Sequence, residues 1–226
     1  ENPNNLDLIN LRGFLYKNQK QFPQAEQSFS KYIQLKKDSE SGYRNLALVY
    51  IQQNQLDKAV AIYKQGLEVM PKNGNLLFGL AELYEKSAKL NDAMQVYTDV
   101  LKIAPDNRLA ANNLAALIAN TTDDKKRLSE AYDLVKPFKD THEPALLDTF
   151  GWLSFLNGDI DAAVNALEKV IKRYPDFAEF NYHLGMAYAA KDRKEEAKLA
   201  LKKALANSAN FPGRDKATAK LSELGG

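Results

Sequence analysis

The sequence contains no cysteine and only two histidines, His142 and His183, among its 226 residues. Disulfides and thiolate zinc sites are therefore excluded, and multi-histidine metal chemistry nearly so. No apolar run approaches the roughly 18 residues that a membrane-spanning helix requires. The net charge is only +2, which argues against a strongly basic nucleic-acid-binding face. With 45% hydrophobic and 27% charged residues, the composition is that of a folded globular chain.

The same residue classes recur with a period of 34, a step that several positions share. Small residues, tyrosines and a second set of small residues follow it: Gly13, Ala47, Ala81 and Ala115; Tyr16, Tyr50 and Tyr84; Ala25, Ala59 and Ala93. The period resumes at Gly151 and Gly185 after a slip in register. The extra residues fall in the polar run 120–125, which we interpret as a lengthened turn.

Each unit is predicted to form two helices. In the second unit, apolar residues at helical spacing line one face of residues 59–70, and the polar run 52–55 separates this segment from an apolar stripe before it. Pro71 and Pro105 follow the second helices, because proline cannot continue a helix. Glycine or alanine at the recurring small places lets the two helices approach closely. One pair cannot bury its apolar face alone, so neighbouring pairs must stack.

These residues resemble the tetratricopeptide repeat (TPR) family. Its pattern stands here as Tyr43, Leu46, Ala47, Tyr50, Ala59, Tyr63 and Pro71, and again as Leu77, Leu80, Ala81, Tyr84, Ala93, Tyr97 and Pro105. The resemblance implies an all-α fold, an α-solenoid wound as a right-handed superhelix. We assign six TPR units to residues 6–39, 40–73, 74–107, 108–143, 144–177 and 178–211.

The two ends are expected to differ. Residues 212–226 contain Ala217, Leu221 and Leu224 and are predicted to form a capping helix at the C-terminal end. Residues 1–5 are interpreted as the remnant of a preceding repeat, with Pro3 in its last-turn place. We therefore expect further repeats before Glu1, in a larger bacterial TPR protein.

The resemblance also implies a binding surface, because the first helix of each TPR unit lines a concave groove. Carried over position by position, the inward residues are Asn10, Phe14, Arg44, Leu48, Phe78, Glu82, Asn112, Asn113, Asp148, Trp152, Phe155, Tyr182, His183 and Met186. Asparagine side chains offer a donor and an acceptor to a partner's backbone. Trp152, the only tryptophan, is either an anchor for a partner or a packing residue between helices, and His183 is expected to be structural.

Catalytic and cofactor sites are not indicated. Glu82 and Glu85 lie three residues apart but are interpreted as a solvated face, and Asp123–Asp124 as a cap for the following helix. No phosphate-binding loop or metal motif is present, so we expect no enzyme activity and no cofactor.

Three functional hypotheses follow. The first is a non-catalytic scaffold that binds a protein or peptide segment in the groove, without nucleic acid and without a membrane span. The second is a cell-envelope assembly factor for exopolysaccharide or surface-protein export, because residues 111–115, 146–152 and 182–187 resemble bacterial TPR proteins of exosortase-type (PEP-CTERM) systems. This resemblance favours a periplasmic or envelope-anchored location, with a cytoplasmic one open. The third and most remote is a helical glycosidase. The oligomeric state stays open.

Overall fold

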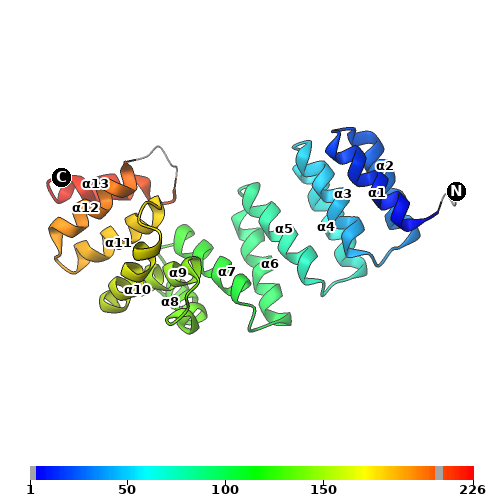
Figure 1. Ribbon diagram of the computed structural model, residues 1–226. Helices are drawn as coiled ribbons and strands as arrows, with labels where there is room; N and C mark the ends of the chain where they lie inside the picture. Colours follow the sequence, from blue (N-terminus) through cyan, green and yellow to red (C-terminus); the bar gives the residue numbers. More distant parts are fainter. Residues whose placement is uncertain (1–3, 207–210) are drawn as a thin grey trace. The chain divides into compact units, whose positions relative to one another are not determined.

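The computed structural model describes residues 4–206 and 211–226, and every regular element within these ranges is helical (Figure 1). The chain forms two compact units, residues 1–110 and 111–226. In the first unit, each helix packs on the next, and α3 also packs on α5. Its helices are α1 (Leu6–Asn18), α2 (Phe22–Leu35), α3 (Glu40–Gln52), α4 (Leu56–Val69), α5 (Gly74–Lys86) and α6 (Leu90–Ile103).

The second unit continues the same arrangement of helix pairs. Its elements are most of α7 (Arg108–Thr121), then α8 (Lys125–Val135), the short 3-10 helix η1 (Lys136–Phe138), α9 (Pro144–Leu156), α10 (Ile160–Arg173), α11 (Ala178–Ala190), α12 (Lys194–Leu205) and α13 (Arg214–Glu223). Successive helices from α8 to α13 pack together, and α9 also packs on α11. The all-α class of stacked helix pairs is as predicted.

Helix ends recur with the sequence period. The first helix of each pair begins at residue 6, 40, 74, 108, 144 or 178, where the six predicted units start. The turn inside a pair contains a left-handed residue at the same place: Lys20, Asn54, Ala88 and Asp192 have φ between 55° and 58°, and Gly158 has φ of 84°. This conformation is a common way to end an α-helix.

Small residues bring the two helices of a pair together, as predicted. A Cβ atom on Gly13 would lie 2.6 Å from the ring of Phe29, and one on Gly151 or Gly185 would lie 2.7 Å from the Cγ atom of Leu167 or Leu201. These distances are shorter than real Cβ contacts, so the helices meet at a place where only hydrogen fits.

The polar run 120–125 is not one lengthened turn, and that prediction is wrong at both ends. Asn120 and Thr121 belong to α7, where the Thr121 hydroxyl donates to the carbonyl of Leu117 at 2.6 Å. Lys125 begins α8, because Asp124 accepts a hydrogen bond from the backbone N–H of Arg127 at 3.0 Å and caps the helix. The capping role that the sequence predicted for this acidic pair therefore falls to Asp124.

The C-terminal helix α13 packs on α11 and α12. Ala217 is buried there, and Leu221 and Leu224 pack against the same core cluster. At the other end of the chain, α1 carries Leu8, Leu11 and Leu15 as exposed side chains at helical spacing. The predicted repeat remnant at residues 1–5 includes Pro3, which lies outside the described residues.

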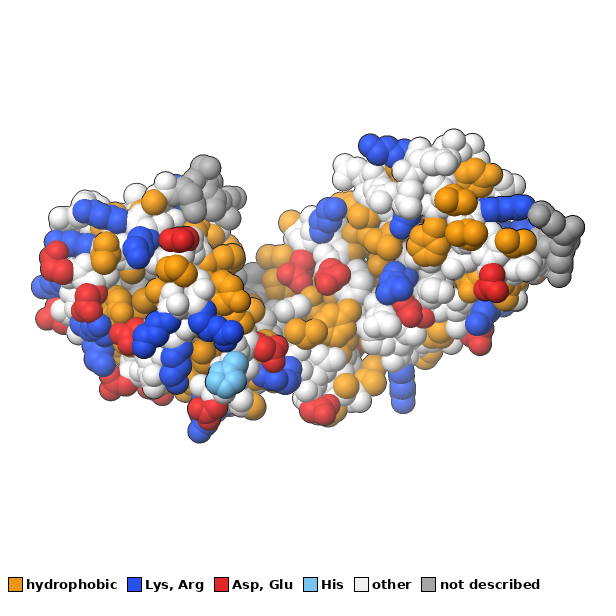
Figure 2. Space-filling model, viewed as in Figure 1, with side chains coloured by type: hydrophobic (Ala, Val, Ile, Leu, Met, Phe, Trp, Pro, Cys, Tyr) orange, Lys and Arg blue, Asp and Glu red, His pale blue; other side chains and the backbone are white. Residues whose placement is uncertain are grey.

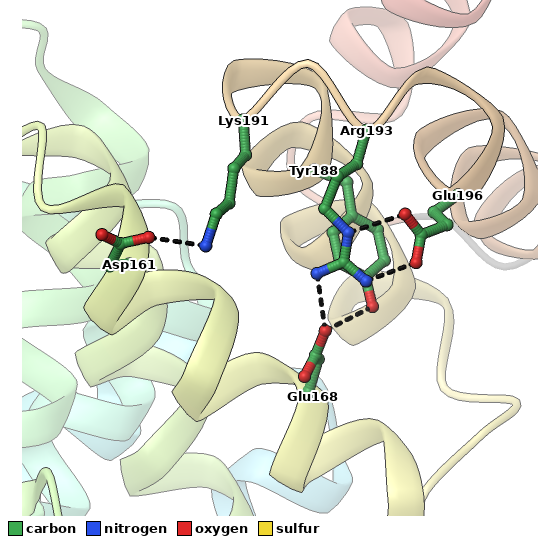
Figure 3. Close-up of polar contacts among 6 residues, drawn as sticks. All are labelled: Asp161, Glu168, Tyr188, Lys191, Arg193 and Glu196. Atoms are coloured by element: carbon green, nitrogen blue, oxygen red, sulfur yellow. Dashed lines mark hydrogen bonds and ion pairs between the residues drawn. The ribbon is translucent and has the colours of Figure 1, made fainter.

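A polar network joins α10, α11 and α12 (Figure 3). Glu168 on α10 accepts from the Tyr188 hydroxyl and from Nη1 of Arg193, both at 2.9 Å. Arg193 also pairs with Glu196 and lies over the Tyr188 ring, 4.1 Å from its centroid. Burial, together with the hydrogen bond to Glu168, raises the pKa of Tyr188 to about 12. The network fixes the connection between α11 and α12 against α10.

Charged side chains of both signs are interspersed over each unit on the face seen in Figure 2. This pattern agrees with the small net charge of the chain. Within residues 4–206 and 211–226, no helix combines the length and the apolar character that crossing a bilayer requires.

Candidate partner-binding site

Asp148 and His183 form a buried polar pair in the second unit. The Nδ1 atom of His183 on α11 lies 3.0 Å from Oδ1 and 2.9 Å from Oδ2 of Asp148 on α9. The two residues are only 4% and 6% exposed. Because Nδ1 serves the carboxylate, the other ring nitrogen is left for a different partner. That atom, Nε2, is buried and has no hydrogen-bond partner among the described residues.

Trp152 stacks on this pair. Its ring lies 4.3 Å from the His183 ring at an angle of 16°, and 5.0 Å from the Phe155 ring at 17°. The residue is 7% exposed and belongs to a core cluster with Tyr182, Leu201 and Phe211. Its indole Nε1–H is also buried without a partner in the described part of the chain. Orphaned buried donors are rare in folded proteins, so two unpaired ring nitrogens in stacked residues call for an explanation.

A cavity of about 230 Å³ lies beside these rings. It is bounded by α7, α9 and the start of α11, and all of its walls belong to the second unit. Its lining residues are Ala116, Asn120, Ala145, Asp148, Thr149, Trp152, Phe177, Glu179, Phe180 and His183. A small, largely apolar recess with a few polar groups is the usual form of a binding site.

Glu179 contributes a second carboxylate to the cavity. It is half-buried, and its side chain has no hydrogen-bond or ion-pair partner among the residues that the structure describes. Burial raises the pKa of Glu179 above its ordinary value; the nearby His183 opposes this change and the Asp148 carboxylate adds to it. The carboxylate is therefore partly desolvated with no direct hydrogen-bond or ion-pair partner.

Aromatic side chains stand at the rim. Phe177, the residue immediately before α11, is 51% exposed, and its ring lies 4.3 Å from that of Phe180. Tyr174 meets Phe180 edge to face at 6.4 Å and is 44% exposed. Phe177 lines the cavity and Tyr174 contacts the lining residue Phe180, so these two exposed rings form an apolar surface next to the cavity that a partner can reach.

Comparison with known proteins identifies the family of this chain. Sequence profiles of the Tetratricopeptide repeat match residues 50–118 and 151–214. The chain belongs to the tetratricopeptide repeat family. A curated relative, TPR repeat-containing protein PA4667 of Pseudomonas aeruginosa, is 33% identical over 134 residues, which are 58% of this chain. The matched part spans only 22% of that relative's length.

Solved structures agree with the TPR fold. A tetratricopeptide repeat protein from Parabacteroides merdae aligns over 97% of this chain and 88% of its own, with a TM-score of 0.68 and 16% identity. YrrB, described as a TPR protein with an unusual peptide-binding site, aligns over 86% of this chain and 97% of its own, with a TM-score of 0.66 and 21% identity. MamA aligns over 79% of this chain and 94% of its own, with a TM-score of 0.59 and 24% identity.

The TPR groove residues predicted in the first unit lie on α1, α3 and α5. Asn10 accepts a long hydrogen bond of 3.5 Å from Asn45, and Arg44 pairs with Glu40 at 3.3 Å. Two predicted aromatic residues are half-buried against the second helix of their own pair, since Phe14 packs on Phe29 and Phe78 on Tyr97. Leu48 is half-buried and Glu82 is exposed.

In the second unit, three of the predicted TPR groove residues meet at the cavity, namely Asp148, Trp152 and His183. Tyr182 is 2% exposed and belongs to the core cluster, and Phe155 and Met186 are partly buried against the same cluster. Asn112 donates to Asn113 at 3.3 Å, and its own Oδ1 atom is buried without a partner among the described residues. The Trp152 ring packs in the core, as one of its two predicted roles requires, and also lines the cavity; its role as an anchor for a partner stays a prediction.

The predicted TPR groove omits Phe177, Glu179 and Phe180. A signal for Phe177 was present, because Asn5, Asn73 and Asn107 occupy the place before a first helix and each caps that helix through its side-chain oxygen. Phenylalanine at the equivalent place before α11 makes no side-chain cap, nor do Ser39 before α3 and Glu143 before α9, but Phe177 alone of these places a large apolar ring there. A residue that gives up a stabilising cap and exposes its ring is a candidate for a functional role.

The other candidate sites considered from the sequence, a carboxylate pair and a metal site, do not form in the described part of the chain. Glu85 accepts from the Tyr97 hydroxyl at 2.7 Å, while Glu82 is exposed on the same helix, so the two do not act as a carboxylate pair. Within the described ranges, no group of three or more histidine, aspartate or glutamate side chains is placed to hold a metal ion.

Proposed function

We propose that this chain is a protein-interaction scaffold that binds a segment of a partner protein on the face formed by the first helices of its pairs. In the second unit, the cavity beside Trp152 and His183 is the anchor point. The observation that carries the proposal is the pair of buried, unpartnered ring nitrogens in residues that line this cavity. When the two rings shift to expose these atoms, a partner's backbone or side chain supplies the missing hydrogen bonds and offsets the cost of leaving them unmade.

The TPR fold supports this function, because stacked helix pairs present an extended surface made of many side chains. YrrB, whose fold is similar, is described as having an unusual peptide-binding site. The first unit, taken by itself, offers its own proposed surface on α1, α3 and α5, made of the predicted groove residues Asn10, Phe14, Arg44, Leu48, Phe78 and Glu82.

The proposal is tested by selecting displayed random peptides against the full chain and against a variant with a blocked cavity. Ala145 lines the cavity and is exposed, so Ala145→Trp fills the recess without disturbing the core. Ala219→Trp, at an exposed position on α13, is the matched control. We expect selected peptides to bind the wild-type chain and the control and to lose binding to Ala145→Trp. Peptides that bind all three proteins equally would refute the assignment.

A further inference from the structure

We propose that the cavity between α9 and α11 takes a basic side chain, lysine or arginine, from the bound segment. The inference rests on the proposed function and adds to it the chemistry of the residue that is recognised. The juxtaposition that carries it is a partnerless carboxylate, Glu179, beside the buried Asp148–His183 pair and an exposed aromatic rim.

The charge of the walls has one sign. Asp148 and Glu179 are the carboxylates, His183 is the only basic group, and neither lysine nor arginine lines the cavity. The walls therefore carry a net charge of −2 with a neutral His183 ring and −1 with a protonated one. A ligand carboxylate would be repelled in either case, whereas a cation would compensate the partly desolvated carboxylate of Glu179.

The unpaired nitrogens of His183 and Trp152 match the hydrogen-bonding groups of a lysine or arginine residue in a peptide. With Nδ1–H donated to Asp148, Nε2 of a neutral His183 is an acceptor and can receive an N–H from an ammonium or guanidinium group. The Trp152 indole N–H is a donor and can serve a backbone carbonyl of the same segment. Both atoms are buried in the unliganded chain, so these hydrogen bonds form once the Trp152 and His183 rings shift toward the bound residue.

The rim suits the rest of such a side chain. Lysine and arginine carry an apolar stem that packs on aromatic rings, and their charged ends are attracted to the ring faces. Phe177 and Phe180 provide such rings at the mouth, and Phe177 does so at a place where the chain forgoes a helix cap. The cavity volume of about 230 Å³ is below the roughly 300–1,000 Å³ of sites for drug-sized ligands, so it holds one side chain.

The test uses the indole resonance of Trp152 as a reporter. Trp152 is the only tryptophan, so a nitrogen–proton correlation spectrum of the full chain shows a single indole peak. The probes are end-capped tripeptides, Ala-Arg-Ala and Ala-Lys-Ala. They are compared with Ala-citrulline-Ala, which keeps the shape of arginine without its charge, and with Ala-Phe-Ala and Ala-Glu-Ala. We expect saturable shifts with the two basic peptides and about tenfold weaker binding of the citrulline peptide.

A substitution at Glu179 provides the second arm. Glu179→Gln keeps the shape of the side chain and should weaken Ala-Arg-Ala to the level of the citrulline peptide, with citrulline binding unchanged. Glu195→Gln, on the exposed face of α12 outside the cavity, should leave both affinities as in the wild type. Equal or tighter binding of the phenylalanine, citrulline or glutamate peptide would overturn the proposal, as would the absence of a shift with every peptide.

The two proposals fail separately. If displayed peptides require an open cavity but share no lysine or arginine, the basic-residue proposal fails and the scaffold function stands. If no selected peptide depends on the cavity, the anchor assignment fails together with the inference built on it. Enrichment of lysine or arginine in cavity-dependent peptides would support both.

Discussion

The Nδ1 atom of His183 lies 2.9 Å from the Oδ2 atom of Asp148, and this contact joins equivalent helices of two successive repeats. The pair holds α11 against α9 at the wall of the cavity and orients the imidazole ring that stacks on Trp152. A buried carboxylate–imidazole contact fixes which ring nitrogen stays available for another partner. The same contact therefore serves packing between repeats and the recognition chemistry of the site.

We expect Asp148→Ala to lower the free energy of unfolding by about 1.5–3 kcal/mol, because it leaves the buried His183 ring without its acceptor. The double variant Asp148→Ala, His183→Leu should lose less stability than the sum of the two single variants, since neither partner is then left unpaired. Urea denaturation of the four proteins measures the coupling. Additive losses would show that the two side chains contribute independently.

Trp152→Ala should destabilise the chain by about 3–5 kcal/mol, because a large buried ring is removed from the core cluster. The buried position means that loss of binding in this variant cannot be separated from loss of packing. Trp152→Phe is the better probe, because it keeps an aromatic ring and removes the unpartnered Nε1–H. Thermal melting should show that Trp152→Phe loses less stability than Trp152→Ala. Peptide-binding measurements should show that Trp152→Phe nevertheless binds peptide clearly more weakly than the wild type.

The repeat and its helix pairs could be predicted because they depend on local patterns that recur. Gly151 and Gly185, for example, are identified by spacing alone, and both meet a leucine of the second helix. The Asp148–His183 contact could not be predicted in the same way. Both residues belong to the predicted groove, but their pairing depends on the stagger of α9 against α11, which packing sets.

Phe177 and Glu179 lay outside the prediction for a different reason. The predicted groove residues begin at the fifth place of each first helix, whereas Phe177 precedes α11 and Glu179 holds the second place, in the first turn of that helix. Their role emerges only when α7 and α9 supply the other walls of the cavity. No described residue bears on the envelope-export hypothesis, which stays a prediction.

Glu179 should make stability depend on pH. Its pKa is raised in the folded chain, mainly by burial, so the folded state favours the protonated form. This contribution to stability is fully present below the ordinary pKa of a glutamate and is lost as the pH rises through the raised value. We therefore expect Glu179→Gln to melt at a higher temperature than the wild type at pH 7, with the difference shrinking toward pH 4. A constant difference across this range would contradict the assigned cause.

The left-handed turn residue Ala88 offers a test of the backbone geometry. Its φ of 55° is unfavourable for a residue with a Cβ atom, and the side chain is exposed. Ala88→Gly should raise the free energy of unfolding by about 0.5–1 kcal/mol, because glycine adopts this conformation without strain. Ala61→Gly, at an exposed place inside α4, should lower it by about 1 kcal/mol. Chemical denaturation should show that the two substitutions change the free energy of unfolding in opposite directions.

The close approach of α9 and α10 at Gly151 predicts that any larger residue at this position destabilises the chain. A Cβ atom there would lie 2.7 Å from Cγ of Leu167, which is itself fully buried. Gly151→Ala should therefore cost about 1–3 kcal/mol through overpacking, although alanine is the better helix former. Gly74→Ala is the matched control, because nothing lies within 4 Å of its Cβ position at the start of α5, and it should be neutral or stabilising. Equal stability of the two variants in denaturant titrations would mean that the helix pair is not in contact at Gly151.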